Sequence, residues 1–342
     1  MKNYCIFELA ALAALTFASC SSESVEELGG GNQASQQVAI GFDGYLGRSA
    51  VDTRGSESTT ATIQAADKGF GVFGNYTSGS DVSYGSDLFK NQHVTYKTSN
   101  NISKWVYTPV KYWPTAGHID FLAYAPYVKG TELTGSSINF TVADQVANQT
   151  DLLWANANKQ TKADNSGTNK VKFTFKHALA KIGYSVTSTN NDDQTTITVK
   201  SIKLVGSEDG QTAAFYTKGT IDLSKDNNEA NDLWTITDDT KQNFTLLSSD
   251  QTLSTKYEPT DFLFVIPQDF SGKTNNLYVV VEYTVTTDGS AITNTVSKKI
   301  SRKFLQGKAY MINLTIGLTP IEFNAEVSLW TDDNSEDIDL NK

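Results

Sequence analysis

Hydrophobic and polar residues alternate along most of this chain with the two-residue period of β-strands. The first such segment is Val38-Ala-Ile-Gly-Phe42, whose apolar residues Val38, Ile40 and Phe42 would share one face of a strand. From residue 69 onward, short segments rich in β-branched and aromatic residues follow one another, separated by polar loops. These segments predict an all-β fold, with a first group at residues 69–76, 93–97, 104–108, 118–125 and 137–142 and a second group at 171–175, 197–204, 262–266, 277–285, 309–316 and 321–327.

The longest break in this series is a polar loop around residues 160–170. Because many short strands in two groups are typical of sandwiches, we expect two tandem antiparallel β-sandwich domains, at residues 38–170 and 171–331. Residues 43–68 form another polar stretch, which would isolate the first strand from those that follow. Only residues 177–183 have a helix-like composition, and the segment is too short for a substantial helix.

The two ends of the chain differ in composition from its centre. Residues 1–19 carry one lysine near the start, a short apolar run and small residues at the end, and they predict a signal peptide. Ala18-Ser19-Cys20 resembles a bacterial lipobox with Cys20 as the lipidated residue, although an ordinary signal peptide is the alternative. Residues 20–37 are rich in Ser, Glu, Gly and Gln and predict a flexible tether, and residues 332–342 predict a solvated acidic tail.

Composition narrows the possible functions. The 28 basic and 38 acidic residues give a net charge of −10, which argues against a nucleic-acid partner because such proteins need a basic surface. Only two cysteines are present, Cys5 and Cys20, so nothing downstream can supply a thiol nucleophile or a cysteine-ligated metal. We therefore expect no cofactor and no metal site.

Several motifs could carry chemistry, and each has a simpler structural interpretation. Gly69-Phe-Gly-Val-Phe-Gly74 matches a dinucleotide-binding fingerprint, but a polar loop follows it instead of a helix, which favours a glycine-punctuated strand. His93, His118 and His177 lack zinc-ligand spacing, and His118 and His177 lie in apolar strand patterns typical of structural imidazoles. No catalytic nucleophile motif is present, so we expect no enzyme, although two facing carboxylates of a glycosidase would leave no sequence motif.

Two neighbouring aromatic clusters allow two interpretations. Residues 112–114 read Tyr-Trp-Pro, and residues 121–127 read Phe-Leu-Ala-Tyr-Ala-Pro-Tyr. These rings could form a platform on which a carbohydrate stacks, or they could point inward as core aromatics around a turn at residues 114–117. The spacing favours the core.

Five segments of the chain resemble those of a known family. The segments at 69–73, 109–114, 121–127 and 173–182, together with Phe323-Asn-Ala-Glu-Val-Ser-Leu-Trp330, are similar to those of fimbrillin-like lipoproteins of Bacteroidetes, in the same order. The resemblance implies two transthyretin-like β-sandwiches and a role in type V pili, with export as an outer membrane lipoprotein. It also implies cleavage after an arginine, removal of the first strand, and insertion of a strand from a neighbouring pilin subunit.

The sequence contains residues that suit each step of that mechanism. Arg54, within Val51-Asp-Thr-Arg-Gly55, follows the lone strand in a polar segment, and Arg48 is a second candidate for cleavage. Both could instead be exposed loop arginines in a subunit that is not cut. Val38, Ile40 and Phe42 would belong to the removable strand, and residues 321–330 form the candidate donor strand.

We therefore expect a fimbrial subunit of the stalk, tip or anchor that supports cell adhesion, with other pilin subunits as partners. A host protein or glycan is a possible adhesive ligand. One alternative is a monomeric outer membrane lipoprotein that binds glycans, and another is an exported glycosidase.

Overall fold

The structure is a computed structural model that describes residues 37–46, 58–189, 194–225, 233–253, 256–257, 259, 262–318 and 324–329. Nearly all of their regular secondary structure is β-strand, with one short α-helix and one 3-10 turn, which confirms the all-β prediction. The predicted signal peptide, Cys20, Arg48, Arg54 and the predicted acidic tail lie outside the described residues. In the described part of the chain, no helix has the length and apolar character needed to cross a membrane.

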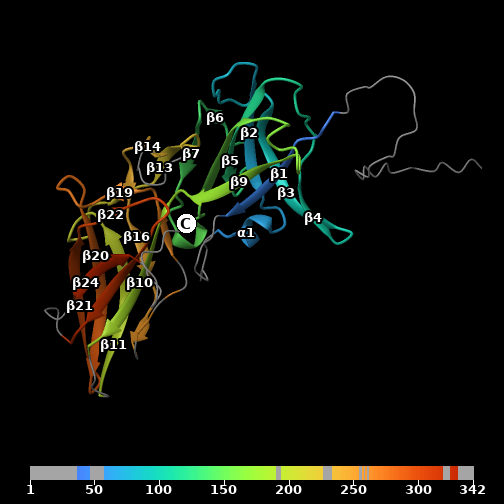
Figure 1. Cartoon of the computed structure of the whole chain (residues 1–342). Coiled ribbons are helices and arrows are strands. Elements are labelled where there is room, and N and C mark those ends of the chain that lie inside the picture. The colour runs from blue at the N-terminus through green and yellow to red at the C-terminus, as the bar shows by residue number, and fades with distance from the viewer. Residues whose placement is uncertain are drawn as a thin grey trace, which may run out of the picture. The chain divides into compact units, whose positions relative to one another are not determined.

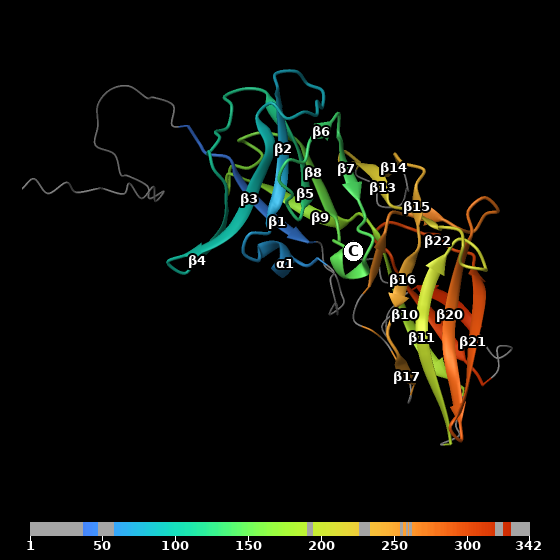
Figure 2. The same ribbon diagram turned by 180° about the vertical axis from the view of Figure 1, so that it is seen from behind.

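A seven-stranded sheet contains the first strand and most of the first predicted domain (Figures 1 and 2). Its order is β1-β9-β8-β5-β2-β3-β4, and β1 at one end of this order also contacts β4 at the other end. Short helix α1 (Thr60–Gln64) buries Ile63 against the same core. The strands are β1 (Gly41–Leu46), β2 (Phe70–Thr77), β3 (Phe89–Ser99), β4 (Ile102–Val106), β5 (His118–Ala125), β8 (Leu153–Gln160) and β9 (Lys170–His177).

Alternation in β9 explains how this sheet encloses a core. Val171, Phe173 and Phe175 are fully buried, whereas the two residues between them, Lys172 and Thr174, are exposed. Central strand β5 differs because all eight of its residues are buried. Its odd-numbered residues from 119 to 125 join the aromatic core with Phe173, whereas Leu122 and Tyr124 join a second core on the opposite face. Both faces of the sheet are therefore covered.

Two further sheets hold most of the later strands around that second core. One has the order β18-β10-β23-β24, and the other has the order β16-β11-β20-β21 with β17 paired to β11. Ile182, Val279 and Ile312 are fully buried members of the shared core. The strands are β10 (Ala180–Ser188), β11 (Thr195–Val205), β16 (Phe244–Leu247), β17 (Gln251–Leu253), β18 (Leu263–Val265), β20 (Leu277–Thr287), β21 (Ser290–Ile300), β23 (Ala309–Ile316) and β24 (Asn324–Leu329).

Smaller sheets complete the described fold. A four-stranded sheet has the order β14-β13-β7-β6, and β12 pairs with β15 and β19 with β22. The remaining elements are β6 (Leu133–Thr134), β7 (Ser137–Thr141), a 3-10 turn at Val146–Asn148, β12 (Phe215–Tyr216), β13 (Lys218–Asp222), β14 (Trp234–Ile236), β15 (Lys241–Gln242), β19 (Gln268–Asp269) and β22 (Lys303–Phe304).

The structure differs from the sequence predictions in three places. The first strand continues through Leu46, into the stretch expected to be polar loop, and α1 lies in that stretch too. Residues 180–183, within the segment of helix-like composition, belong to β10, because their side chains are buried in a sheet. Two pairings, β1 with β9 and β10 with β23, are parallel and not antiparallel.

Strand pairing also crosses the position expected to separate two domains. β9 begins at Lys170 but pairs with β1 and β8, and β7 pairs with β13. The described residues, all of which follow position 36, group into one compact unit.

Candidate functional site: the groove occupied by the first strand

The segment from Val38 to Leu46 is hydrogen-bonded to two separate parts of the chain. The Ile40 N–H donates to the Lys111 carbonyl at 2.9 Å, and the Trp113 N–H donates to the Val38 carbonyl at 2.9 Å. From Gly41 onward, β1 pairs instead with β9 in parallel, in a register that places Phe42 opposite Val171. The segment therefore fills a groove between residues 111–113 and β9.

Alternate side chains of this segment point into the aromatic core. Ile40 and Phe42 are each only 2% exposed, and Leu46 is 8% exposed, whereas Val38 is half-buried. The inward orientation predicted for Ile40 and Phe42 agrees with this burial. The Phe42 ring lies 5.3–6.5 Å, centroid to centroid, from five aromatic rings: those of Phe70, Phe89, Tyr107, Phe121 and Phe173.

Gly44 occupies the inward position between Phe42 and Leu46, where little space remains. A Cβ atom on Gly44 would lie 3.0 Å from Phe70 Cε1 and 3.2 Å from Phe175 Cε2. Both distances are shorter than ordinary contact between carbon atoms, so even a methyl side chain requires the neighbouring rings to shift by a few tenths of an ångström, and larger side chains are excluded. The groove therefore accepts the inward pattern aliphatic, aromatic, small and aliphatic at positions 40, 42, 44 and 46.

Tyr107 fastens the segment from the side. Its hydroxyl donates to the Ile40 carbonyl at 2.7 Å and accepts from the Lys111 N–H at 3.2 Å. Burial raises the pKa of Tyr107 above its usual value, because the ionised phenolate would lose hydration. Tyr107 thus links both sides of the groove as a neutral phenol.

The groove lies next to the segment that contains both arginines. On one side of residues 47–57, the Leu46 N–H donates to Thr60 Oγ1 at 3.0 Å. On the other side, the Ser58 N–H donates to Asp151 Oδ2 at 2.9 Å, and its hydroxyl donates to the Asp151 carbonyl at 3.0 Å. The chain is therefore anchored on both sides of the segment that contains Arg48 and Arg54.

The Ser58 anchor contains a serine, a histidine and an aspartate, but its geometry is structural. His177 Nδ1 lies 2.8 Å from Asp151 Oδ2, and both residues are at most 1% exposed. Since the Ser58 hydroxyl donates to a backbone carbonyl and the group is buried, no substrate carbonyl could reach it. This cluster joins Ser58 to the segment before β8 and to the end of β9.

Comparison with known proteins places the chain in a family. The family model described as fimbrillin-like matches residues 53–330. The chain belongs to the fimbrillin-like family. It is 29% identical to fimbrium subunit Fim1C of Phocaeicola vulgatus over 392 aligned positions, which cover 98% of each protein.

Solved structures show the same fold. This fimbrillin-like protein is similar to a fimbrial protein from Bacteroides vulgatus ATCC 8482, with 23% identity and a TM-score of 0.62 over 85% of this chain and 98% of the other. A candidate cell adhesion protein from Bacteroides uniformis ATCC 8492 gives 17% identity and a TM-score of 0.50, over 87% and 99% of the two chains. The family resemblance inferred from the sequence motifs is confirmed.

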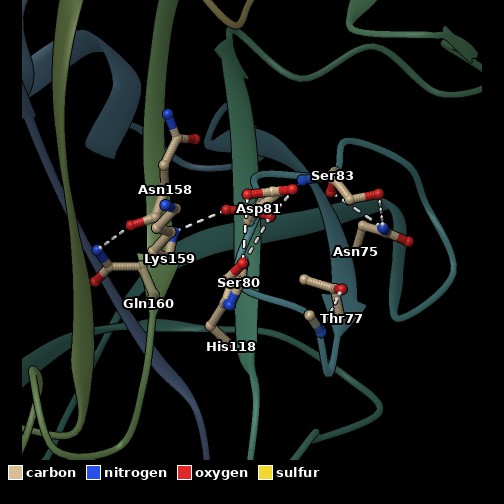
Figure 3. Close-up of polar contacts among 11 residues, drawn as sticks. Asn75, Thr77, Ser80, Asp81, Ser83, His118, Asn158, Lys159 and Gln160 are labelled. Atoms are coloured by element: carbon tan, nitrogen blue, oxygen red, sulfur yellow. Dashed lines mark hydrogen bonds and ion pairs between the residues drawn. The ribbon is translucent and has the colours of Figure 1, made fainter.

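The second buried histidine also belongs to a structural cluster (Figure 3). Asp120 is 1% exposed; its Oδ2 accepts from the Ser83 N–H at 2.8 Å and lies 3.2 Å from His118 Nε2, while its Oδ1 accepts from the Lys159 N–H at 2.7 Å. Two residues of β8, Asn158 and Lys159, stand opposite Asp120, where the register of β5 and β8 shifts. The carboxylate thus stabilises a β-bulge and the loop around Ser83.

The glycine motif of this fimbrillin-like protein lies in β2 except for Gly69, which immediately precedes the strand, as the strand interpretation predicted. A Cβ atom on Gly71 would lie 2.4 Å from the Tyr124 ring, and one on Gly74 would lie 2.8 Å from the Phe89 ring. These glycines therefore allow close packing of neighbouring aromatic rings and do not form a phosphate-binding turn. No group of three or more His, Cys, Asp or Glu residues suited to a metal ion occurs among the described residues.

The two aromatic clusters divide between the core and the surface. Trp113, Phe121 and Tyr124 are buried, as the core interpretation predicted, whereas Tyr112 is 47% exposed and Tyr127 is half-buried.

The sequence interpretation missed Gly44, Leu46 and Tyr107 as parts of the groove. Alternation continues through residues 44 and 46, so the strand extension had a sequence signal, but the position of Tyr107 had none.

Proposed function

We propose that this protein is a fimbrial subunit whose first strand is exchanged for a strand of a neighbouring subunit. The observation that supports this proposal most is that Ile40 and Phe42 are buried in the core although their segment forms the terminal strand in the order of its sheet. That segment continues into residues 47–57, which contain Arg48 and Arg54. Cleavage after Arg54 would separate the segment from the domain covalently, while Ser58 stays anchored to Asp151.

Removal of the first strand would leave an unfavourable surface. The ring cluster around Phe42 would be opened to water, and the backbone groups of β9 and Lys111 that pair with the segment would lose their partners. Exposed apolar area and unpaired strand edges both favour the entry of another strand. A neighbouring subunit would supply this strand, which would form main-chain hydrogen bonds with the groove and insert alternate side chains into it.

The C-terminal segment carries the same inward pattern as the first strand. Residues 40–46 read Ile-Gly-Phe-Asp-Gly-Tyr-Leu, and residues 321–327 read Ile-Glu-Phe-Asn-Ala-Glu-Val. Aligned in this way, Ala325 takes the place of Gly44, the position at which only a very small residue fits. We take residues 321–327 of a second copy as the donor, in the register that places Ile321 at the Ile40 position.

In the single chain, part of this donor segment is already a strand. β24 pairs with β23 in antiparallel register, with Asn324 opposite Thr315 and Leu329 opposite Tyr310. β24 is the last strand in the order of its sheet, so it can leave β23 without separating two other strands. Assembly would then exchange the pairing with β23 for a pairing with β9 of the neighbour.

Export and membrane attachment complete the proposal. Residues 1–19 direct export, and acyl chains on Cys20 hold the uncleaved protein at the outer membrane. Cleavage would release the subunit from that anchor because Cys20 precedes both arginines. The protein acts without enzymatic activity, and its partners are other fimbrial subunits at the cell surface.

Mass spectrometry of the mature N-terminus in assembled fimbriae tests the proposal. We expect an N-terminus at Gly55, or at Ser49 if Arg48 is cleaved, and loss of assembly when both arginines are replaced by alanine. Replacement of Arg302 is the matched control, since Arg302 follows β21 and lies outside the segment next to the groove. An assembled subunit that begins at Cys20 would refute the processing step.

A further inference from the structure

A pocket away from the first strand is lined mainly by aromatic, aliphatic and uncharged polar residues. It has a volume of about 490 Å³, and its walls come from the loop after β5, from β7 and from the segment after β7. This volume is within the range of about 300–1,000 Å³ typical of small-molecule sites. No residue of β1 or β9 lines it, so it is separate from the groove of the first strand.

The pocket combines flat apolar surfaces with uncharged polar groups. Tyr127 and Phe140 supply half-buried aromatic rings, and Asn139, Asn148 and Thr150 supply exposed amide and hydroxyl groups. A sugar ring has the matching surface, because its C–H groups form an apolar face and its hydroxyls surround that face. Aromatic rings bind such a face, whereas amides donate to and accept from hydroxyls.

The ring of Tyr127 is held in place before any ligand binds. It stacks on the His93 ring with centroids 3.9 Å apart and planes 7° apart. The backbone N–H of Tyr127 donates to the Gly69 carbonyl at 3.2 Å. His93 Nε2 lies 2.8 Å from the Lys68 carbonyl, which connects the stacked pair to another part of the wall. His93 is thus a positioning residue for Tyr127.

The loop that carries Tyr127 is also fixed. The Tyr124 hydroxyl lies 2.9 Å from the Val128 carbonyl and accepts from the Val128 N–H at 3.2 Å. Asn91 Nδ2 and Thr131 Oγ1 each donate to that carbonyl at 3.0 Å. Because the wall is already ordered, a ligand would lose little binding free energy to ordering the protein.

The charges that line the pocket favour a neutral ligand. Asp67 and Lys68 are adjacent in sequence and exposed, and they contribute one charge of each sign. Asp67 is the only aspartate or glutamate among the described residues that line this pocket. The two facing carboxylates that glycoside hydrolysis needs are therefore absent from its wall. We propose that this pocket binds, without cleaving, a neutral saccharide whose ring stacks on Tyr127.

A printed array of neutral, sialylated and sulfated oligosaccharides, probed with the full chain, tests the proposal. We expect binding to neutral glycans, weakened about tenfold or more by Tyr127→Ala. Asn139→Ala, which removes one exposed amide, should also weaken binding and guards against misfolding of the Tyr127 variant. Tyr112→Ala is the matched control, since Tyr112 is an exposed tyrosine outside the pocket lining.

Three outcomes would overturn the proposal. They are no binding to neutral glycans, preferential binding to sialylated or sulfated glycans, and neutral-glycan binding that neither Tyr127→Ala nor Asn139→Ala weakens. Each variant should retain the wild-type circular dichroism spectrum. The result is independent of strand exchange, which this pocket does not require.

Discussion

At the scale of single residues, the groove depends on a few side chains in close contact. Phe42 contributes most, because its ring contacts aromatic residues from several strands, including Phe89 and Phe173. Gly44 contributes by its lack of a side chain, and Tyr107 by a single hydrogen bond to Ile40. Each of these roles can be tested by one substitution.

Replacing Phe42 with alanine should destabilise the uncleaved protein strongly. Removing a fully buried aromatic ring costs about 3–5 kcal/mol of unfolding free energy, through lost burial and a residual cavity. Tyr45→Ala on the same strand should cost at most about 1 kcal/mol, because Tyr45 is 45% exposed and its hydroxyl only accepts from Thr174 Oγ1. Urea unfolding measures both values, and equal losses would contradict the inward orientation of Phe42.

Tyr107 should make the stability of the uncleaved protein sensitive to alkaline pH. Burial raises the pKa of the folded phenol above its usual value of 10.0, so above that pH the unfolded state binds fewer protons than the folded state. The resulting stabilisation is present below pH 10 and is lost as the pH rises through the folded pKa. Melting temperatures between pH 8 and 11 should fall less steeply for Tyr107→Phe than for the wild type, and parallel curves would refute this.

At the scale of elements, the first segment (residues 40–46) and the C-terminal segment (residues 321–327), which contribute to β1 and β24, have similar sequence patterns. Gly44 and Ala325 are small residues that coincide when the two segments are aligned from Ile40 and Ile321. Their partners in the single chain differ, since β1 pairs with β9 in parallel and β24 pairs with β23 in antiparallel. The proposed exchange therefore requires β24 to leave β23 and its segment to pair with β9 of a neighbouring subunit.

A synthetic peptide of residues 320–330 should bind protein that has been cleaved after Arg54 and freed of its first strand in mild denaturant. The peptide should raise the melting temperature of this protein, and its Ala325→Leu variant should bind about tenfold or more weakly, because overpacking a core costs about 1–3 kcal/mol. Glu326→Leu is the matched control, since the corresponding residue of β1, Tyr45, faces outward. Equal affinity of the wild-type and Ala325→Leu peptides would contradict the proposed register.

At the scale of the whole molecule, the two groups of strands are not independent. The second core joins Leu122 and Trp154 of the seven-stranded sheet to residues of later strands, such as Ile182. A buried hydrogen bond of 2.7 Å from the Phe264 N–H to Gln149 Oε1 connects β18 to the segment before β8. The strand exchange proposed for the groove thus takes place in a sheet whose other face is already packed.

The sequence by itself determined the all-β class, the family and the inward face of the first strand. Alternation is a local property, and a run such as Val38-Ala-Ile-Gly-Phe42 separates its two faces wherever it pairs. The same local pattern distinguished the glycine motif of β2 from a nucleotide-binding turn.

Only the tertiary structure decided what these faces contact. The pairing of β1 with β9, the hydrogen bond from Tyr107 to Ile40 and the stacking of Tyr127 on His93 join residues distant in sequence. Residues 180–183 likewise form part of β10 despite their helix-like composition, because they are buried between strands. The physical reason is that local preferences amount to tenths of a kcal/mol per residue, whereas burial of a large side chain contributes about 1.5–3 kcal/mol and depends on which distant residues surround it.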